Sequence, residues 1–152
     1  MATSVSDDID NLEKAKQELG PDYTPSDDED YMGEKQQTYF KILLLEWKRS
    51  IHEAADQTLQ SLQDGPIREP DLNDRASSET DWGIELRTRD RQRKLISKID
   101  SSLRRLEEGE YGYCEITGDP IGLKRLIARP VATMTVEAQE AHERREKISR
   151  DD

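Results

Sequence analysis

Residues 32–63 read MGEKQQTYFKILLLEWKRSIHEAADQTLQSLQ, and this stretch sets the architecture of the chain. After Gly33 it contains no proline or glycine. Its apolar residues recur at helical spacing: Tyr39, Ile42, Leu45, Ala55, Leu59 and Leu62. The pattern predicts one long amphipathic helix, a rod on the order of 45 Å for some thirty residues at about 1.5 Å each.

A second helix is predicted beyond Gly65, Pro66 and Pro70, which interrupt the pattern. From about Asp74 to Glu107 the apolar residues are again three or four apart: Trp82, Leu86, Leu95, Ile99, Leu103 and Leu106. Two helices of similar length joined by a short turn bury their stripes by packing antiparallel. The fold class is therefore mainly α, with a long antiparallel coiled-coil hairpin over residues 32–108 and its tip at about 64–80.

The second helix has a polar interval between Leu86 and Leu95. It holds five bases and one acid over residues 87–94. Two interpretations stay open: a solvated helix face with internal pairs such as Asp90 with Lys94, or a surface that binds a partner.

The segment before the hairpin, residues 1–31, is acidic. Its first thirty residues hold ten acids and two lysines, a net charge of −8. Ile9, Leu12 and Leu19 predict a short helix that begins near Ser6, ends at Gly20, and packs on the globular lobe.

The segment after the hairpin divides into two parts. Residues 109–134 are rich in turn formers and predict a small loop-rich lobe. Thr135 is expected to cap a final helix over residues 135–152, with Glu137 in its first turn.

Composition limits the function. The 152 residues carry 34 acids and 23 bases, a net charge of −11, with 32% hydrophobic residues and a mean hydropathy of −1.00. So thin a core excludes a large pocketed enzyme, and the acidity argues against nonspecific nucleic-acid binding. No stretch is apolar enough to span a membrane and the N-terminus is unlike a signal peptide, so we expect a cytoplasmic protein with a protein partner.

Two separated motifs resemble the DksA family over roughly residues 32–150. The first is Asp71-x-x-Asp74-Arg75-Ala76 followed by Glu85-Leu86-Arg87-x-Arg89-Asp90-Arg91-x-Arg93-Lys94-Leu95-Ile96. The second is Tyr111-Gly112-Tyr113-Cys114-Glu115, followed by Gly118, Ile121-Gly122, Arg125-Leu126, Ala128-Arg129-Pro130 and Glu143-x-x-Glu146-Lys147. The resemblance implies a zinc-finger-like lobe beside the hairpin and a factor that binds bacterial RNA polymerase in its secondary channel.

The metal motif of the family is degenerate here. Zinc-binding relatives carry two C-x-x-C pairs, whose positions fall on Cys114, Thr117, Thr135 and Ala138. A structural zinc needs about four thiolate or imidazole ligands, so we expect no bound zinc. We expect hydrogen bonds of Thr117 and Thr135 and apolar packing to hold the lobe; the apolar residues are Ile116, Ile121, Leu126, Val131 and Val136. Cys114, the one cysteine, is either a small packing residue or a redox-sensitive thiol.

The resemblance also implies roles along the hairpin. Asp71, Asp74 and Ala76 match the tip presented near the polymerase active centre, although the two aspartates also fit a helix N-cap and first turn. Arg87 and Arg91 match residues that dock on the polymerase rim. Family members form a binding site for guanosine tetraphosphate (ppGpp) together with polymerase, and four positions here match that site: Leu95, Lys98, Arg129 and Gln139. Relatives carry a lysine at the position of Gln139.

The resulting expectation is a non-enzymatic regulator of initiation. It would repress stable-RNA promoters, activate amino-acid promoters and act with ppGpp in the stringent response, as a monomer without specific DNA contacts. The alternatives are a secondary-channel transcript-cleavage or competitor factor that uses the tip acids with Mg²⁺, and a coiled-coil adaptor for another protein.

Overall fold

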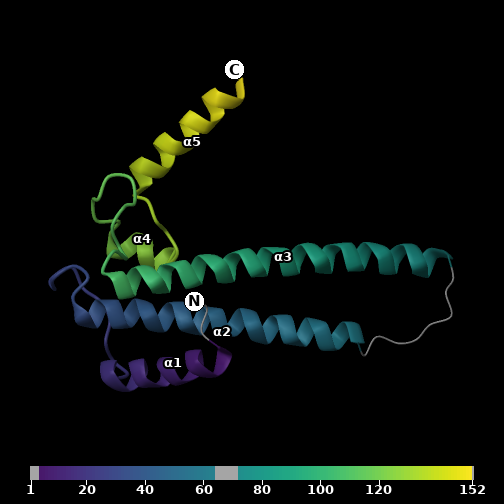
Figure 1. Ribbon diagram of the computed structural model, residues 1–152, viewed down its shortest axis with the longest axis horizontal. Helices are drawn as coiled ribbons and strands as arrows, with labels where there is room; N and C mark the ends of the chain where they lie inside the picture. Colours follow the sequence, from purple (N-terminus) through teal and green to yellow (C-terminus); the bar gives the residue numbers. More distant parts are fainter. Residues whose placement is uncertain (1–3, 64–71, 152) are drawn as a thin grey trace.

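The computed structural model describes residues 4–63 and 72–151, and the side chains of residues 4–60 and 79–150. These residues form five helices: α1 (Val5–Leu19), α2 (Glu34–Gln63), α3 (Leu72–Glu108), α4 (Leu123–Ala128) and α5 (Val136–Asp151). Helices α2 and α3 run side by side, α1 lies along the other side of α2, and α5 projects from the lobe that contains α4 (Figure 1). The predicted mainly α-helical hairpin fold is confirmed.

The core lies where the hairpin meets the lobe. Phe40 and Leu44 from α2 and Ile99 from α3 are fully buried, and they share one cluster with Tyr111 and Leu126 of the lobe. The rings of Phe40 and Tyr111 lie 5.5 Å apart between centroids. Fully burying each such side chain contributes roughly 1.5–3 kcal/mol, so this junction fixes the lobe on the hairpin.

The seam away from the lobe differs from the prediction. We expected Trp82, Leu86 and Leu59 to be buried between the helices, but they are 49%, 57% and 41% exposed. The polar interval 87–94 supplies no apolar side chain that would close the seam there. Among the described side chains, those at the base of the hairpin are buried, whereas these three are not enclosed.

Helix α1 corrects two expectations. Its N-cap is Ser4 and not Ser6, because Ser4 has an extended backbone and its side chain accepts a hydrogen bond from the amide of Asp7. The helix also packs along α2 rather than on the lobe: its buried face of Leu12 and Ala15 lies there, and Lys16 pairs with Glu46 of α2 at 2.6 Å.

The loop between α1 and α2 makes the contact with the lobe that the sequence predicts for α1. The Tyr31 hydroxyl donates to the carbonyl of Gly112 at 2.6 Å and accepts from the amide of Gly122 at 3.0 Å. Met32 packs so closely on Gly112 that a Cβ there would lie 2.9 Å from its Cγ. The loop is thereby pinned across the base of the hairpin.

The lobe has little regular structure beyond α4 and one antiparallel bridge between Tyr113 and Pro120. Of its five predicted packing residues, Ile121, Leu126 and Val131 are buried, whereas Ile116 and Val136 are 55% and 46% exposed. The two exposed residues lie on the outer turn after Cys114 and on the first position of α5, beyond the thin core. No helix in residues 4–63 or 72–151 combines the length and hydrophobicity that a membrane span requires.

Candidate functional site

The tip residues named from the sequence fall at the limit of the structure. Asp71 lies outside the described residues. Asp74 and Ala76 lie in the first turns of α3, which begins at Leu72, but their side chains are outside the described set. Their helical position agrees with either interpretation of the aspartates.

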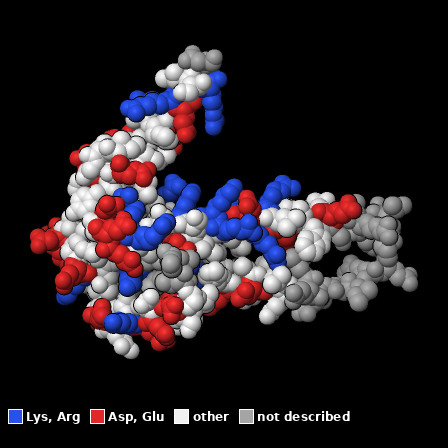
Figure 2. Space-filling view, viewed as in Figure 1, with Lys and Arg blue, Asp and Glu red and all other residues white. Residues whose placement is uncertain are grey.

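The outer half of α3 carries a basic face. Arg87 and Arg91 are both exposed one turn apart, and the Nε of Arg87 donates to the carbonyl of Gly83 at 3.3 Å. The expected intrahelical pair is present, with Lys94 Nζ 3.1 Å from a carboxylate oxygen of Asp90. Lysines and arginines gather along the side of α3 that faces α5 (Figure 2). Because these bases project from a rigid helix, the surface suits an acidic partner.

The four residues matched to a nucleotide site come from three elements around the lobe. Leu95 is half-buried and Lys98 exposed, one turn apart on α3. Arg129 is the C-cap residue of α4, and the side-chain amide of Gln139 on α5 donates to Glu143 at 3.0 Å. No hydrogen bond or ion pair joins these four described side chains to one another.

The four degenerate metal positions converge in the lobe. The hydroxyl of Thr117 accepts a hydrogen bond from the amide of Asp119 at 3.2 Å, and that of Thr135 accepts one from the amide of Ala138 at 3.2 Å, capping α5 as predicted. Within the described residues, no three His, Cys, Asp or Glu side chains are placed to share a metal ion. One thiol, two hydroxyls and a methyl group do not fit zinc.

The thiol of Cys114 occupies the centre of this arrangement and is buried, with 4% of the residue exposed. Burial raises the pKa of this thiol, but hydrogen bonds from the Thr117 hydroxyl and from the amides of Thr117, Thr135 and Ile116 lower it to about 7. Those donors favour the thiolate in the way a metal ion would. The hydrogen bonds to the Cys114 sulfur therefore connect the first pair of degenerate metal positions, through Thr117, with the second pair, through Thr135.

A buried ion triad is the main feature that the sequence did not reveal. The ammonium of Lys48 on α2 lies 2.7 Å from a carboxylate oxygen of Asp8 on α1 and 2.7 Å from one of Asp100 on α3. Burial alone lowers the pKa of Lys48, but the hydrogen bonds and charges of Asp100 and Asp8 outweigh it, and the pKa is raised. The triad ties three helices together, and no periodicity of a single helix could have indicated it.

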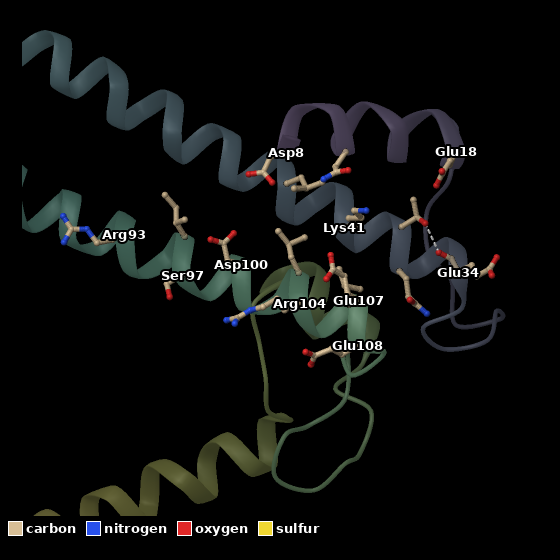
Figure 3. Close-up of a pocket in the computed structure, with 17 residues that line it drawn as sticks. Asp8, Glu18, Glu34, Lys41, Arg93, Ser97, Asp100, Arg104, Glu107 and Glu108 are labelled. Carbon is tan, nitrogen blue, oxygen red and sulfur yellow. Dashed lines mark hydrogen bonds between the residues drawn. The ribbon is translucent and has the colours of Figure 1, made fainter. Parts of the chain in front are cut away.

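A groove of about 980 Å³ runs between α1, α2 and α3. Figure 3 shows Asp8, Lys41 and Asp100, one from each helix, around it. Its floor includes Leu45, Ile96, Leu103 and Leu106. The described lining contains neither cysteine nor histidine, so it offers no nucleophile with a histidine base.

Comparison with protein families gives two matches in tandem. Residues 36–106 match the N-terminal domain of the DnaK suppressor protein DksA. Residues 109–144 match the prokaryotic dksA/traR C4-type zinc finger. The boundary between the two coincides with the end of α3 at Glu108.

Individual proteins agree with these matches. The chain is 63% identical over 131 residues to the RNA polymerase-binding transcription factor DksA of Caulobacter vibrioides, covering 86% of this chain and 92% of that one. It is 40% identical over 125 residues to the factor of that name from Escherichia coli K12, covering 82% and 83%. The solved structure of transcription factor DksA2 from Pseudomonas aeruginosa superposes with a TM-score of 0.72 at 38% identity, covering 90% of this chain and 98% of that one.

Proposed function

Because this chain belongs to the DksA family, we propose that it is a transcription regulator that binds RNA polymerase. Its relatives in Caulobacter vibrioides and Escherichia coli are named for that binding. The observation that carries the proposal is the exposed basic face around Arg87 and Arg91 on the long helix α3. A rigid basic rod can be recognised by an acidic groove without any catalytic chemistry in the rod itself.

The hairpin is the part that would enter the polymerase. Helix α3 has 37 residues, which corresponds to roughly 55 Å at 1.5 Å per residue. We propose that this rod passes through the secondary channel and brings Asp71, Asp74 and Ala76 near the active centre. Carboxylates there would act on the charges of the initiation complex and alter its stability.

Helix α3 and the lobe would together supply cations to ppGpp at the junction with polymerase. Lys98 and Arg129 are exposed and would contact phosphates, while Leu95 would border the nucleotide. Gln139 gives one cation fewer than a lysine would, and its amide is already held by Glu143. We therefore propose a site that binds ppGpp with reduced affinity, and a role in the stringent response at stable-RNA and amino-acid promoters.

The test is in vitro initiation from a stable-RNA promoter with polymerase, this protein, and ppGpp present or absent. We expect inhibition that ppGpp enhances and that Asp74→Asn removes while the variant still binds polymerase. An Arg87→Ala/Arg91→Ala variant should lose binding. Release of shortened RNA from stalled complexes would instead establish the cleavage function, and no binding by the wild-type protein would refute the proposal.

A further inference from the structure

Two tyrosine hydroxyls hold the segment of the lobe that carries Arg129. Arg129 is exposed and ends α4 as its C-cap residue. The Tyr111 hydroxyl donates to the carbonyl of the next residue, Pro130, at 2.7 Å. The Tyr31 hydroxyl accepts from the amide of Gly122 at 3.0 Å, and Gly122 is the N-cap residue of α4. The segment from the start of α4 to Arg129 is therefore held at both of its ends.

The bridge made by Tyr111 starts in the hairpin. The amide of Tyr111 donates to the carbonyl of Arg105, in the last turn of α3, at 3.1 Å, and its ring packs on that of Phe40 on α2. Only 3% of Tyr111 is exposed, and burial raises the pKa of its hydroxyl, so the hydroxyl remains a donor at neutral pH. One buried side chain thus links α3 to the residue next to Arg129.

The bridge made by Tyr31 comes from the loop between α1 and α2. Its hydroxyl also donates to the carbonyl of Gly112 at 2.6 Å, so it is held between two backbone groups of the lobe. Its ring meets that of Tyr113 edge-on, with the centroids 5.6 Å apart. The start of α4 is therefore fixed from a second direction.

The proposed nucleotide site depends on how α4 is placed relative to α3. Lys98 lies on α3 and Arg129 at the end of α4, so one ligand can bind both only if the two elements keep a fixed separation. Hydrogen bonds from a guanidinium to phosphate oxygens are directional, and they weaken when the donor is displaced. Because the side chains at the degenerate metal positions do not fit zinc, this separation depends on hydrogen bonds and packing within the chain.

We propose that Tyr111 and Tyr31 are positioning residues for Arg129, and that their hydroxyls set where its guanidinium meets the phosphates of ppGpp. The inference rests on the proposed function, because it concerns the same nucleotide site. The tyrosines act through the backbone on either side of α4 and not by contact with the nucleotide. Loss of either hydroxyl therefore lowers the affinity for ppGpp and leaves the contacts of the hairpin with polymerase intact.

The experiment measures the dissociation constant of ppGpp for the complex of the full-length protein with polymerase, with ppGpp bound by polymerase alone as the background. Tyr111→Phe and Tyr31→Phe each remove one hydroxyl and keep the ring. We expect Tyr111→Phe to weaken ppGpp binding about fivefold, because a charge-assisted hydrogen bond to phosphate is weakened. The dissociation constant of the protein and polymerase without ppGpp should stay within about twofold of the wild type.

Two variants control for effects that do not pass through Arg129. Tyr23→Phe removes a hydroxyl that donates to Glu29 within the same loop between α1 and α2, where the ring packs on Tyr39 of α2. Gly118→Ala strains the backbone of the lobe at a φ of +77°, but its Cβ meets no neighbouring atom. Both should bind ppGpp within about twofold of the wild type, and circular dichroism should show unchanged helicity for all four variants.

A double-mutant cycle tests whether Tyr111 acts through Arg129. Arg129→Ala by itself should weaken ppGpp binding about tenfold or more. Adding Tyr111→Phe to Arg129→Ala should cause no further loss, since the group that Tyr111 positions is then absent. A further fivefold loss in the double variant would show that Tyr111 acts elsewhere, and it would overturn the proposal.

The remaining outcomes separate this proposal from the proposed function. If Arg129→Ala weakens ppGpp binding but both tyrosine variants bind ppGpp like the wild type, positioning is overturned and the nucleotide site stands. If Gly118→Ala loses as much affinity as Tyr111→Phe, the stability of the lobe explains the loss and positioning is again overturned. If the wild-type protein adds no ppGpp binding to polymerase, the nucleotide part of the proposed function fails and positioning fails with it.

Discussion

Replacement of Lys48 by methionine should destabilise the protein far more than loss of a surface ion pair would. The Lys48 side chain is 5% exposed, and those of its partners Asp8 and Asp100 are 12% and 24% exposed. Methionine keeps an unbranched side chain of similar length but leaves two neighbouring carboxylates without a cation. Breaking a buried ion pair from one side costs about 3–5 kcal/mol, and we expect a value near 3 kcal/mol, because water reaches part of Asp100.

The matched control is Lys16→Met. Lys16 also bridges α1 and α2, but it and Glu46 are 48% and 46% exposed. An exposed pair of this kind contributes about 0–1 kcal/mol, so the control should be nearly neutral. The two variants therefore differ in the burial of the charge rather than in the helices that are joined.

Urea unfolding followed by circular dichroism at the helix band measures both free energies of unfolding, with the slope m checked for change. Adding Asp8→Asn and Asp100→Asn to Lys48→Met should recover part of the loss, because the uncompensated charges are then removed. A Lys48→Met variant within 1 kcal/mol of Lys16→Met, or no recovery in the triple variant, would show that the triad does not hold the three helices together.

The contribution of Lys48 to stability should depend on pH, because the pKa of Lys48 is raised in the folded protein. A cation with a raised folded pKa stabilises the fold fully below its unfolded pKa of about 10.4, and this contribution is lost as the pH rises through the folded value. The difference in unfolding free energy between wild type and Lys48→Met should thus be constant at neutral to mildly alkaline pH and shrink above about pH 10.5. A difference that shrank already at pH 8 would contradict the assignment.

Three further predictions concern the lobe. The pKa of Cys114 is lowered to about 7, so its thiolate stabilises the fold above the unfolded pKa of about 8.5, and this contribution is lost as the pH falls through 7. The free energy of unfolding of the wild type minus that of Cys114→Ala should therefore rise between pH 6 and pH 9, as measured by urea titrations. A strong chelator should leave the thermal midpoint unchanged, since the donor set does not fit zinc; a drop accompanied by stoichiometric zinc in elemental analysis would be decisive against it. Gly112→Ala should lower the free energy of unfolding by about 2 kcal/mol or more, because Gly112 has a φ of +90° and the new Cβ would lie 2.9 Å from the Met32 side chain. Gly118→Ala is the control, because Gly118 has a φ of +77° but open space around it. Its loss should be only the backbone strain of about 1 kcal/mol.

Helices α1, α2, α3 and α5 and several of their ends could be predicted because their signals are local. The Gly20 stop and the Thr135 cap were readable within a few residues of sequence, since capping depends on the backbone groups of one turn. The helical period over residues 32–63 also required no knowledge of the rest of the chain. The family motifs in α3 and in the lobe were likewise visible in the sequence alone.

Which apolar side chains are buried and which charged side chains pair were decided only by the tertiary structure. Leu45 and Trp82 both lie on predicted apolar stripes, yet Leu45 is 3% and Trp82 49% exposed. At the base of the hairpin, α1 and the lobe add a second layer of side chains over the stripes. The position of α1 and the pairing of Lys48 with two aspartates needed the same information. A periodic pattern specifies which face of a helix is apolar, but the free energy of burial depends on which other element covers that face.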